Sequence, residues 1–398
     1  MATCASPISV HELERYSSKT ARSRLARAQT QNWYSTITVI ALYGNGLSMS
    51  SSPKISVVMP VYNAGPYLRD AMSSILDQTF RDFEFIIIND GSTDGGAFIL
   101  NEYERKDIRI KVLHQDNQGM IAALNRGCRL ARGQYIARMD ADDISDTRRF
   151  ERQLEYIEQH AEIGILGTGT CNIDKNGRMR TQGRWPTNPK MLKWTHFFGV
   201  CVAHPTVLMR REILERVNFY RPDATHGEDV DLWLRASKIT EFGNVPEILF
   251  KYRIWNDSTS QADSKQRRPM HTELLSSFIK EFLAVEPNME AVEGLRQTRL
   301  GIPPRNLHQI LLTASLIRKL YRKFTKANSL TVSERREIAS DAAKRLAFLS
   351  LHASRLDKVA FISLALQALY LDYRLLSPSS VAKGWERSRQ FSNAMANT

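Results

Sequence analysis

Short apolar runs alternate with helix-like segments between residues 54 and 260, and this alternation constrains the fold more than any other feature. Ile55–Val61 (ISVVMPV) is a β-branched run typical of strands that are buried on both faces. Apolar residues at helical spacing follow it, and Pro66 stands where a helix can begin. Further runs at Phe83–Ile88, Ile108–Leu113 and from Tyr135 continue the pattern. We therefore predict an α/β fold with a mainly parallel central sheet flanked by helices.

The predicted sheet has a charged edge. A helix with one apolar face, expected to end at Gly133, precedes the strand that begins at Tyr135. Asp90 follows the second strand, and Asp140, Asp142 and Asp143 follow the fourth. Sheets of this kind bind ligands at the carboxyl ends of their strands, so we expect a ligand there.

The stretch YIARMDADDI (residues 135–144) crowds three carboxylates after an apolar strand. In extended backbone, Asp140 and Asp142 point to one face. Mg²⁺ and Mn²⁺ prefer oxygen ligands, and Mg²⁺ is often held by one or two carboxylates together with substrate phosphates. A solvated turn that caps the next helix is the alternative. The position at a strand end favours a metal and a phosphate.

A second acidic feature is HGEDVDLWLRASK (residues 226–238), where Glu228 and Asp229 precede an apolar helical stretch. Acids in a first helical turn are favoured by the helix dipole, and Asp231 would then lie on the surface. Alternatively, one of the acids is a general base beside an apolar wall. The residues alone leave both interpretations open. The chain has neither the GxGxxG dinucleotide motif nor the GxxxxGK[ST] phosphate loop.

Five stretches in this order resemble family 2 glycosyltransferases, the inverting GT-A group: SVVMPVYNAGPYLRDAMSSILDQTF, FEFIIINDGSTDGG, NQGMIAALNRGCRLARGQYIARMDADD, HPTVLMRR and GEDVDLWLR. The resemblance covers about residues 54–260. It implies a GT-A domain at residues 53–260 that moves a sugar from a nucleotide-diphospho-sugar to an acceptor hydroxyl. Polysaccharide or glycoconjugate biosynthesis, of the bacterial surface type, is the implied setting.

The resemblance also implies site residues. The catalytic base is Asp229, with Glu228 less favoured. A divalent metal, Mg²⁺ or Mn²⁺, is held by the acids of the DxD region, and the acceptor side includes His204 and Trp255. The implied nucleotide-sugar site comprises Pro60, Val61, Tyr62, Asn63, Asn89, Asp90, Gln118, Asn125, Asp140, Ala141 and Asp142, and the metal site comprises Asp140, Asp142 and Asp143.

Two positions depart from the family pattern. The family often has Asp where this chain has Asn89, which leaves the choice of base open. Members also often carry His at the position of Trp255. Trp255 is expected either to cover the diphosphate or a sugar, or to pack in the core.

The two ends of the chain differ from its centre. Residues 1–52 are predicted to be a poorly ordered extension, and Met49 is a second candidate start. Residues 261–398 are predicted to be helical, and residues 262–398 carry 22 Lys and Arg against 12 Asp and Glu, a net +10 of the +13 total. These basic helices either pack on the catalytic domain or a partner subunit, or contact an anionic membrane that carries a lipid-linked acceptor.

Composition bounds the class further. Wide cysteine spacing, and the lack of a secretory leader or a long apolar segment, favour a cytoplasmic protein, with contact to the inner membrane face left open. No nucleic-acid recognition motif is visible, so a nucleic-acid partner is not expected. A catalytically silent GT-A-fold binding protein and another nucleotide-using transferase remain as alternatives to the glycosyltransferase.

Overall fold

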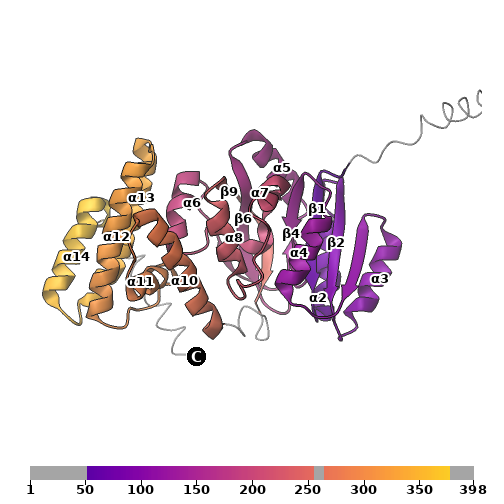
Figure 1. Ribbon diagram of the computed structural model, residues 1–398, viewed down its shortest axis with the longest axis horizontal. Helices are drawn as coiled ribbons and strands as arrows, with labels where there is room; N and C mark the ends of the chain where they lie inside the picture. Colours follow the sequence, from indigo (N-terminus) through magenta and orange to yellow (C-terminus); the bar gives the residue numbers. More distant parts are fainter. Residues whose placement is uncertain (1–51, 255–263, 377–398) are drawn as a thin grey trace, which may run out of the picture. The chain divides into compact units, whose positions relative to one another are not determined.

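The predicted apolar strands form one half of a mixed sheet in a computed structural model that describes residues 52–254 and 264–376. The strand order is β3-β2-β1-β4-β8-β6-β9-β5, with β7 paired to β6 (Figure 1). The strands are β1 (Ile55–Val61), β2 (Phe83–Asp90), β3 (Ile110–Gln115), β4 (Tyr135–Arg138), β5 (Ile144–Ser145), β6 (Ile163–Ile173), β7 (Met179–Gly183), β8 (Leu208–Arg210) and β9 (Glu241–Arg253).

Parallel pairing joins β1 to β2 and β4, β2 to β3, and β6 to β9. The short strands β5, β7 and β8 pair antiparallel with their neighbours. The expected α/β fold with long parallel ladders is therefore confirmed. The strand expected from Ile108 begins two residues later, because Ile108 is fully exposed.

Helices cover both faces of the sheet, as expected because the strands carry apolar residues on both faces. Val57, Met59 and Phe85 share one apolar core with α2, α3 and α5, while the alternate residues Val58 and Ile86 share another with α4, α7 and α8. The helices of this part are α2 (Gly65–Leu76), α3 (Gly96–Lys106), α4 (Met120–Leu130), α5 (Arg149–Gln159), α6 (Pro189–Thr195), α7 (Arg211–Arg216) and α8 (Glu228–Ala236).

Gly133 does not end its helix, contrary to the expectation. Helix α4 ends at Leu130, and the cap residue Ala131 is extended. A Cβ atom at Gly133 would lie 2.5 Å from the backbone nitrogen of Ser56, whose hydroxyl accepts a hydrogen bond from the Gly133 amide. Glycine is needed here because two backbone segments nearly touch.

The basic C-terminal region is helical, as predicted, and comprises α10 (Ser264–Leu283), α11 (Met289–Leu300), α12 (Leu307–Ala327), α13 (Val332–Ala353) and α14 (Lys358–Leu371). Its apolar core includes Trp194 of α6, Phe197 in the turn just after α6, and Val230 and Leu234 of α8. The Trp194 indole also donates to Asp341 of α13 at 2.7 Å. The helices therefore share a core with the sheet domain.

Two expectations about the ends of the domains lie outside the described residues. They are the N-terminal extension, up to residue 51, and the predicted boundary near residue 260. Among the helices of the described ranges, we found none that combines the length and the apolar character needed to cross a bilayer.

Candidate active site

The loops after β1 and β2 are tied together at the carboxyl edge of the sheet. Asp94 accepts hydrogen bonds from the amides of Gly65 (2.7 Å) and Gly96 (2.9 Å). Asn63, whose φ of 50° is tolerated by asparagine, accepts from the Thr93 amide at 2.9 Å. Next to it, the side chain of Tyr62 is 55% exposed, whereas Val61 is buried. The side chain of Tyr62 is thus accessible to a ligand, whereas Val61 could contact a ligand only through its backbone atoms.

Asp90 closes the loop that leads into α4. Its buried carboxylate accepts from the Gln115 side chain (2.7 Å) and from the amides of Gln118 (2.9 Å) and Gly119 (2.8 Å). Asn89 beside it accepts from Ser92 and donates to His114. Asp90 therefore shapes the predicted nucleotide pocket, and a direct contact of Asp90, Asn89 or the exposed Gln118 with the base stays a prediction.

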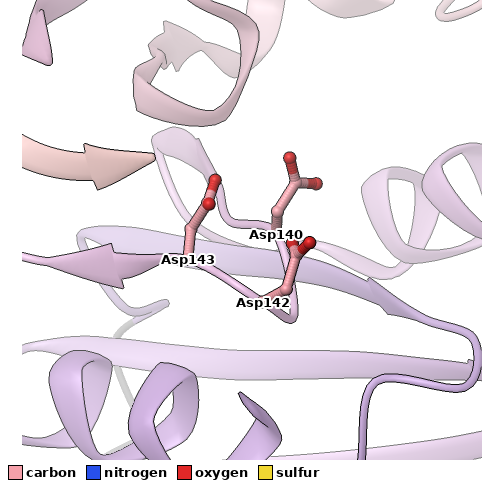
Figure 2. Close-up of side chains that lie close together, drawn as sticks. All are labelled: Asp140, Asp142 and Asp143. Carbon is pink, nitrogen blue, oxygen red and sulfur yellow. The ribbon is translucent and has the colours of Figure 1, made fainter. Parts of the chain in front are cut away.

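The three acids of the turn after β4 lie on one side of it, with carboxylate oxygens within 4.8 Å of one another (Figure 2). Arg138, the last residue of β4, is buried and forms a two-pronged ion pair with Asp140, with both N–O distances at 2.6 Å. Ala141 is buried in the sheet core. The mutual repulsion of the acids is thus partly neutralised by the protein itself.

Asp143 is the most buried of the three acids. Its Oδ1 accepts from the Arg253 amide at 2.7 Å, while its Oδ2 has no hydrogen-bond partner among the described residues. Burial, together with the charges of Asp140 and Asp142, raises the pKa of Asp143 well above its usual value. A buried, unpartnered carboxylate oxygen beside two other carboxylates fits a hard divalent cation.

Two buried arginines that the sequence analysis did not identify support this turn. Arg253, at the end of β9, donates to the carbonyl of Asp142 (2.7 Å) and, through Nη1, to the carbonyls of Asp174 and Lys175. Arg149 donates to the Arg138 carbonyl at 2.7 Å. Arg138 could have been recognised, because it is the one cation in an apolar strand and lies two residues before Asp140.

Helix α8 carries the candidate base at its first turn. Asp229 is partly exposed, and Glu228 is buried. Asp231 is not a surface residue as expected. It is buried and pairs with Arg235 at 2.6 Å and with Arg221 at 3.5 Å. Only Asp229 of the three is both accessible and at the helix N-terminus.

The C-terminal helical region positions this turn. A Cβ at Gly227, the N-cap of α8, would lie 2.9 Å from the Met270 side chain of α10. The ring of His271 hydrogen-bonds to the carbonyl of His226 at 3.1 Å. The approach of α10 thus fixes the backbone immediately before Glu228 and Asp229.

Tyr220 links the acidic turn to α8. Its buried hydroxyl lies within range of the charges of Arg138, Glu228 and Asp229. Burial raises the pKa of Tyr220, and its hydroxyl forms a hydrogen bond with Nε2 of His204 at 2.8 Å. Tyr220 therefore feels both the charge of Arg138, which pairs with Asp140, and the acids at the start of α8.

Two predicted site residues contact Tyr220. His204 is buried against Tyr220 and the edge of Trp233 in α8, and a role on the acceptor side stays a prediction. Asn125 uses both parts of its amide on the backbone of Tyr220, at 2.8 and 3.0 Å. Both residues position Tyr220. Trp255 lies outside the described residues.

The fold and site define an α/β enzyme with an acidic, metal-compatible cluster at the strand ends. The model of the family described as "Glycosyl transferase family 2" matches residues 56–217 of the chain. The chain is 36% identical over 218 residues to EpsE of Bacillus subtilis (strain 168), covering 53% of this chain and 76% of EpsE. It is 34% identical to the O-antigen biosynthesis glycosyltransferase WbnJ of Escherichia coli, covering 54% of this chain and 85% of WbnJ.

Among solved structures, S. aureus TarS 1-349 in complex with UDP-GlcNAc matches with a TM-score of 0.49 and 16% identity, over 80% of this chain and 91% of TarS 1-349. The sequence relatives establish the family. The chain belongs to glycosyltransferase family 2, has the GT-A-like fold, and is a nucleotide-sugar glycosyltransferase.

Proposed function

We propose that this enzyme transfers a sugar from a nucleotide-diphospho-sugar to an acceptor hydroxyl with inversion at the anomeric carbon. The observation that supports this most directly is the cluster of three carboxylates after β4, whose oxygens lie within 4.8 Å of one another and include the buried Oδ2 of Asp143, which has no hydrogen-bond partner among the described residues. An inverting transfer needs a site that holds the leaving diphosphate and a base that takes the proton of the acceptor, and it proceeds without a covalent intermediate. We assign the first role to the acidic turn after β4 and the second to Asp229 of α8.

The donor side is formed by the acidic turn. Asp142 and Asp143 would hold Mg²⁺ or Mn²⁺, with Asp140 fixed beside them by Arg138. When bound, the cation neutralises negative charge on the departing nucleoside diphosphate. Tyr62, exposed at the end of β1, offers an aromatic face to the nucleotide. The loops closed by Asp90 and Asp94 bound the pocket in which base and ribose would lie.

The acceptor side is formed by the first turn of α8. Asp229 is accessible and would take the proton from the attacking hydroxyl. The hydroxyl oxygen then forms a bond to the anomeric carbon as the bond to the diphosphate breaks on the opposite face. Glu228 is buried and cannot reach an acceptor in the same way. Its proposed role is to position the turn.

The acceptor is proposed to be a saccharide or a lipid-linked saccharide in polysaccharide or glycoconjugate biosynthesis. The support is the similarity to WbnJ, which is named for O-antigen biosynthesis. No nucleic-acid partner is proposed.

The test replaces Asp229 with Asn. We expect donor affinity to be unchanged and sugar transfer to fall about 10²-fold or more, the scale of general-base catalysis. Asp223→Asn, which changes an exposed acid before α8, is the matched control and should keep its activity. Donors are screened by release of nucleoside diphosphate, and transfer is then followed by product mass. Transfer by folded Asp229→Asn at close to the wild-type rate would overturn the assignment.

A further inference from the structure

Helix α14 is apolar on almost every side, yet one of its faces is open to solvent. Ala360, Leu364 and Ala368 pack into the helical core. The opposite positions form a continuous exposed stripe at helical spacing. Its members are Val359 (76% exposed), Ile362 (54%), Leu366 (61%), Tyr370 (90%) and, in the turn after the helix, Tyr373 (77%). A helix that is apolar all round is normally covered, so this stripe requires a partner.

Helix α12, which borders α14 at Arg318, presents a row of cations. Neither helix contains an acidic residue. No carboxylate in the described part of the chain forms an ion pair with any member of the row, and the helix dipole accounts only for Lys326, which is in the last turn. The basic row consists of Arg318, Lys319, Arg322, Lys323 and Lys326. By contrast, α13 mixes both signs of charge.

One end of the stripe, at Val359, and one member of the basic row, Arg318, border the same groove. A pocket of about 430 Å³ between α12 and α14 is lined by Leu311 and Arg318 on one side and by Val359 and Gln367 on the other. Arg318 donates to Gln367 across it. The other four cations surround a second, open pocket of about 590 Å³ whose apolar side includes Leu283 and Val285. The cations of α12 therefore lie beside apolar side chains in both pockets, Arg318 next to Val359 of α14 and the other four next to Leu283 and Val285.

We propose that the face formed by α12 and α14 docks on an anionic lipid bilayer. The α14 stripe lies in the interfacial layer, with Tyr370 and Tyr373 as amphipathic anchors, and the basic row contacts lipid phosphates. The long stems of the cations cover apolar surface while their charges reach the headgroups.

Other occupants fit this face less well. A second copy of the chain would bring two uncompensated basic rows close together, and a free phosphate would leave the stripe uncovered. The proposed contact lies on the surface of the bilayer, where an exposed apolar stripe flanked by cations is accommodated. The inference concerns attachment and does not depend on the proposed base or metal.

The test is flotation of the full-length protein with vesicles of neutral phosphatidylcholine, with or without phosphatidylglycerol. We expect binding to the anionic vesicles only. Changing four cations of the row to Gln (Lys319, Arg322, Lys323 and Lys326) should weaken binding about 10²- to 10³-fold, since each cation contributes about fivefold near such a surface. A matched control changes four exposed cations elsewhere to Gln (Arg105, Lys111, Arg216 and Lys344) and should float normally.

A second variant tests the stripe without changing charge. Ile362→Ser with Leu366→Ser alters exposed side chains, so the fold should persist while flotation falls. Nucleoside diphosphate release in solution, measured on every variant, shows that the catalytic site is intact and is independent of lipid. The proposal fails if the wild type does not float, if the α12 variant floats like its control, or if the stripe variant changes only the oligomeric state seen by light scattering.

Discussion

Asp140 has two tasks that mutation can separate, because it belongs both to the acidic turn and to an ion pair with Arg138. Asp140→Asn removes the charge but keeps the shape. Asp142→Asn is the natural comparison, since Asp142 belongs to the same cluster and is not the partner of Arg138. We expect both variants to lose metal-dependent donor binding and only Asp140→Asn to lose substantial stability.

The magnitude follows from the burial of the pair. The Arg138 side chain is 5% exposed and that of Asp140 is 23% exposed. Breaking a buried pair by removing one partner costs about 3–5 kcal/mol, because the remaining charge stays buried. Partial exposure of Asp140 lets water approach, so we expect about 3 kcal/mol. Adding Arg138→Met to Asp140→Asn removes the stranded cation and should restore much of that stability without restoring donor binding.

The measurements are urea unfolding, followed by tryptophan fluorescence, and calorimetric titration of the donor with Mn²⁺. The expected pattern is a stability loss for Asp140→Asn, about 1 kcal/mol or less for Asp142→Asn, and partial recovery in the double variant. If Asp140→Asn unfolds at the same urea concentration as the wild type, the Arg138 pair does not stabilise the fold. If the double variant is no more stable than Asp140→Asn, the stranded-cation argument is wrong.

Two further predictions concern the supports of the site. Arg253→Lys cannot reproduce the fork that reaches the carbonyls of Asp142, Asp174 and Lys175, so stability should fall by about 2–4 kcal/mol and Mn²⁺-dependent donor affinity about tenfold. Arg152→Lys is the control, because the Arg152 side chain is 42% exposed and pairs with surface acids, and equal behaviour of the two variants would contradict the role of Arg253. Gly133→Ala forces a Cβ against the backbone of Ser56 and should cost about 2–3 kcal/mol, with donor affinity per folded molecule unchanged. Gly183→Ala would place its Cβ 3.2 Å from the side-chain hydroxyl of Thr170, which must shift slightly, so it should cost much less than Gly133→Ala in the same unfolding assay.

The sequence predicts those parts of the fold in which the residues of a single segment are enough to indicate its secondary structure and its burial. Ile55–Val61 forms β1 with the predicted bounds because an apolar β-branched run can only be a buried strand here. The three-residue β8 and the Gly- and Thr-containing β6 have no such pattern, and their pairing depends on distant segments. The acidic turn was predictable from its position after a strand.

The contacts of the site residues were not predictable in the same way. His204 and Asn125 are both predicted to lie near ligands. In the structure, His204 hydrogen-bonds to the hydroxyl of Tyr220 and Asn125 to its backbone. A polar side chain that binds a substrate and one that holds a buried backbone segment can be of the same residue type. Only the three-dimensional partners distinguish them, and these partners are up to 95 residues apart in the chain.

The acidic turn shows why the supports matter for chemistry. Arg138 neutralises Asp140, and Arg253 holds the Asp142 carbonyl and the Asp143 carboxylate, so the turn is assembled by the protein's own groups. Burial and the Arg138 charge lower the pKa of Arg149, which holds the Arg138 carbonyl, to about 9. The structure therefore leaves one oxygen, Oδ2 of Asp143, without a partner. A buried ionised carboxylate opposes folding, and a divalent cation with a diphosphate would relieve that cost at the place where the leaving group must be held.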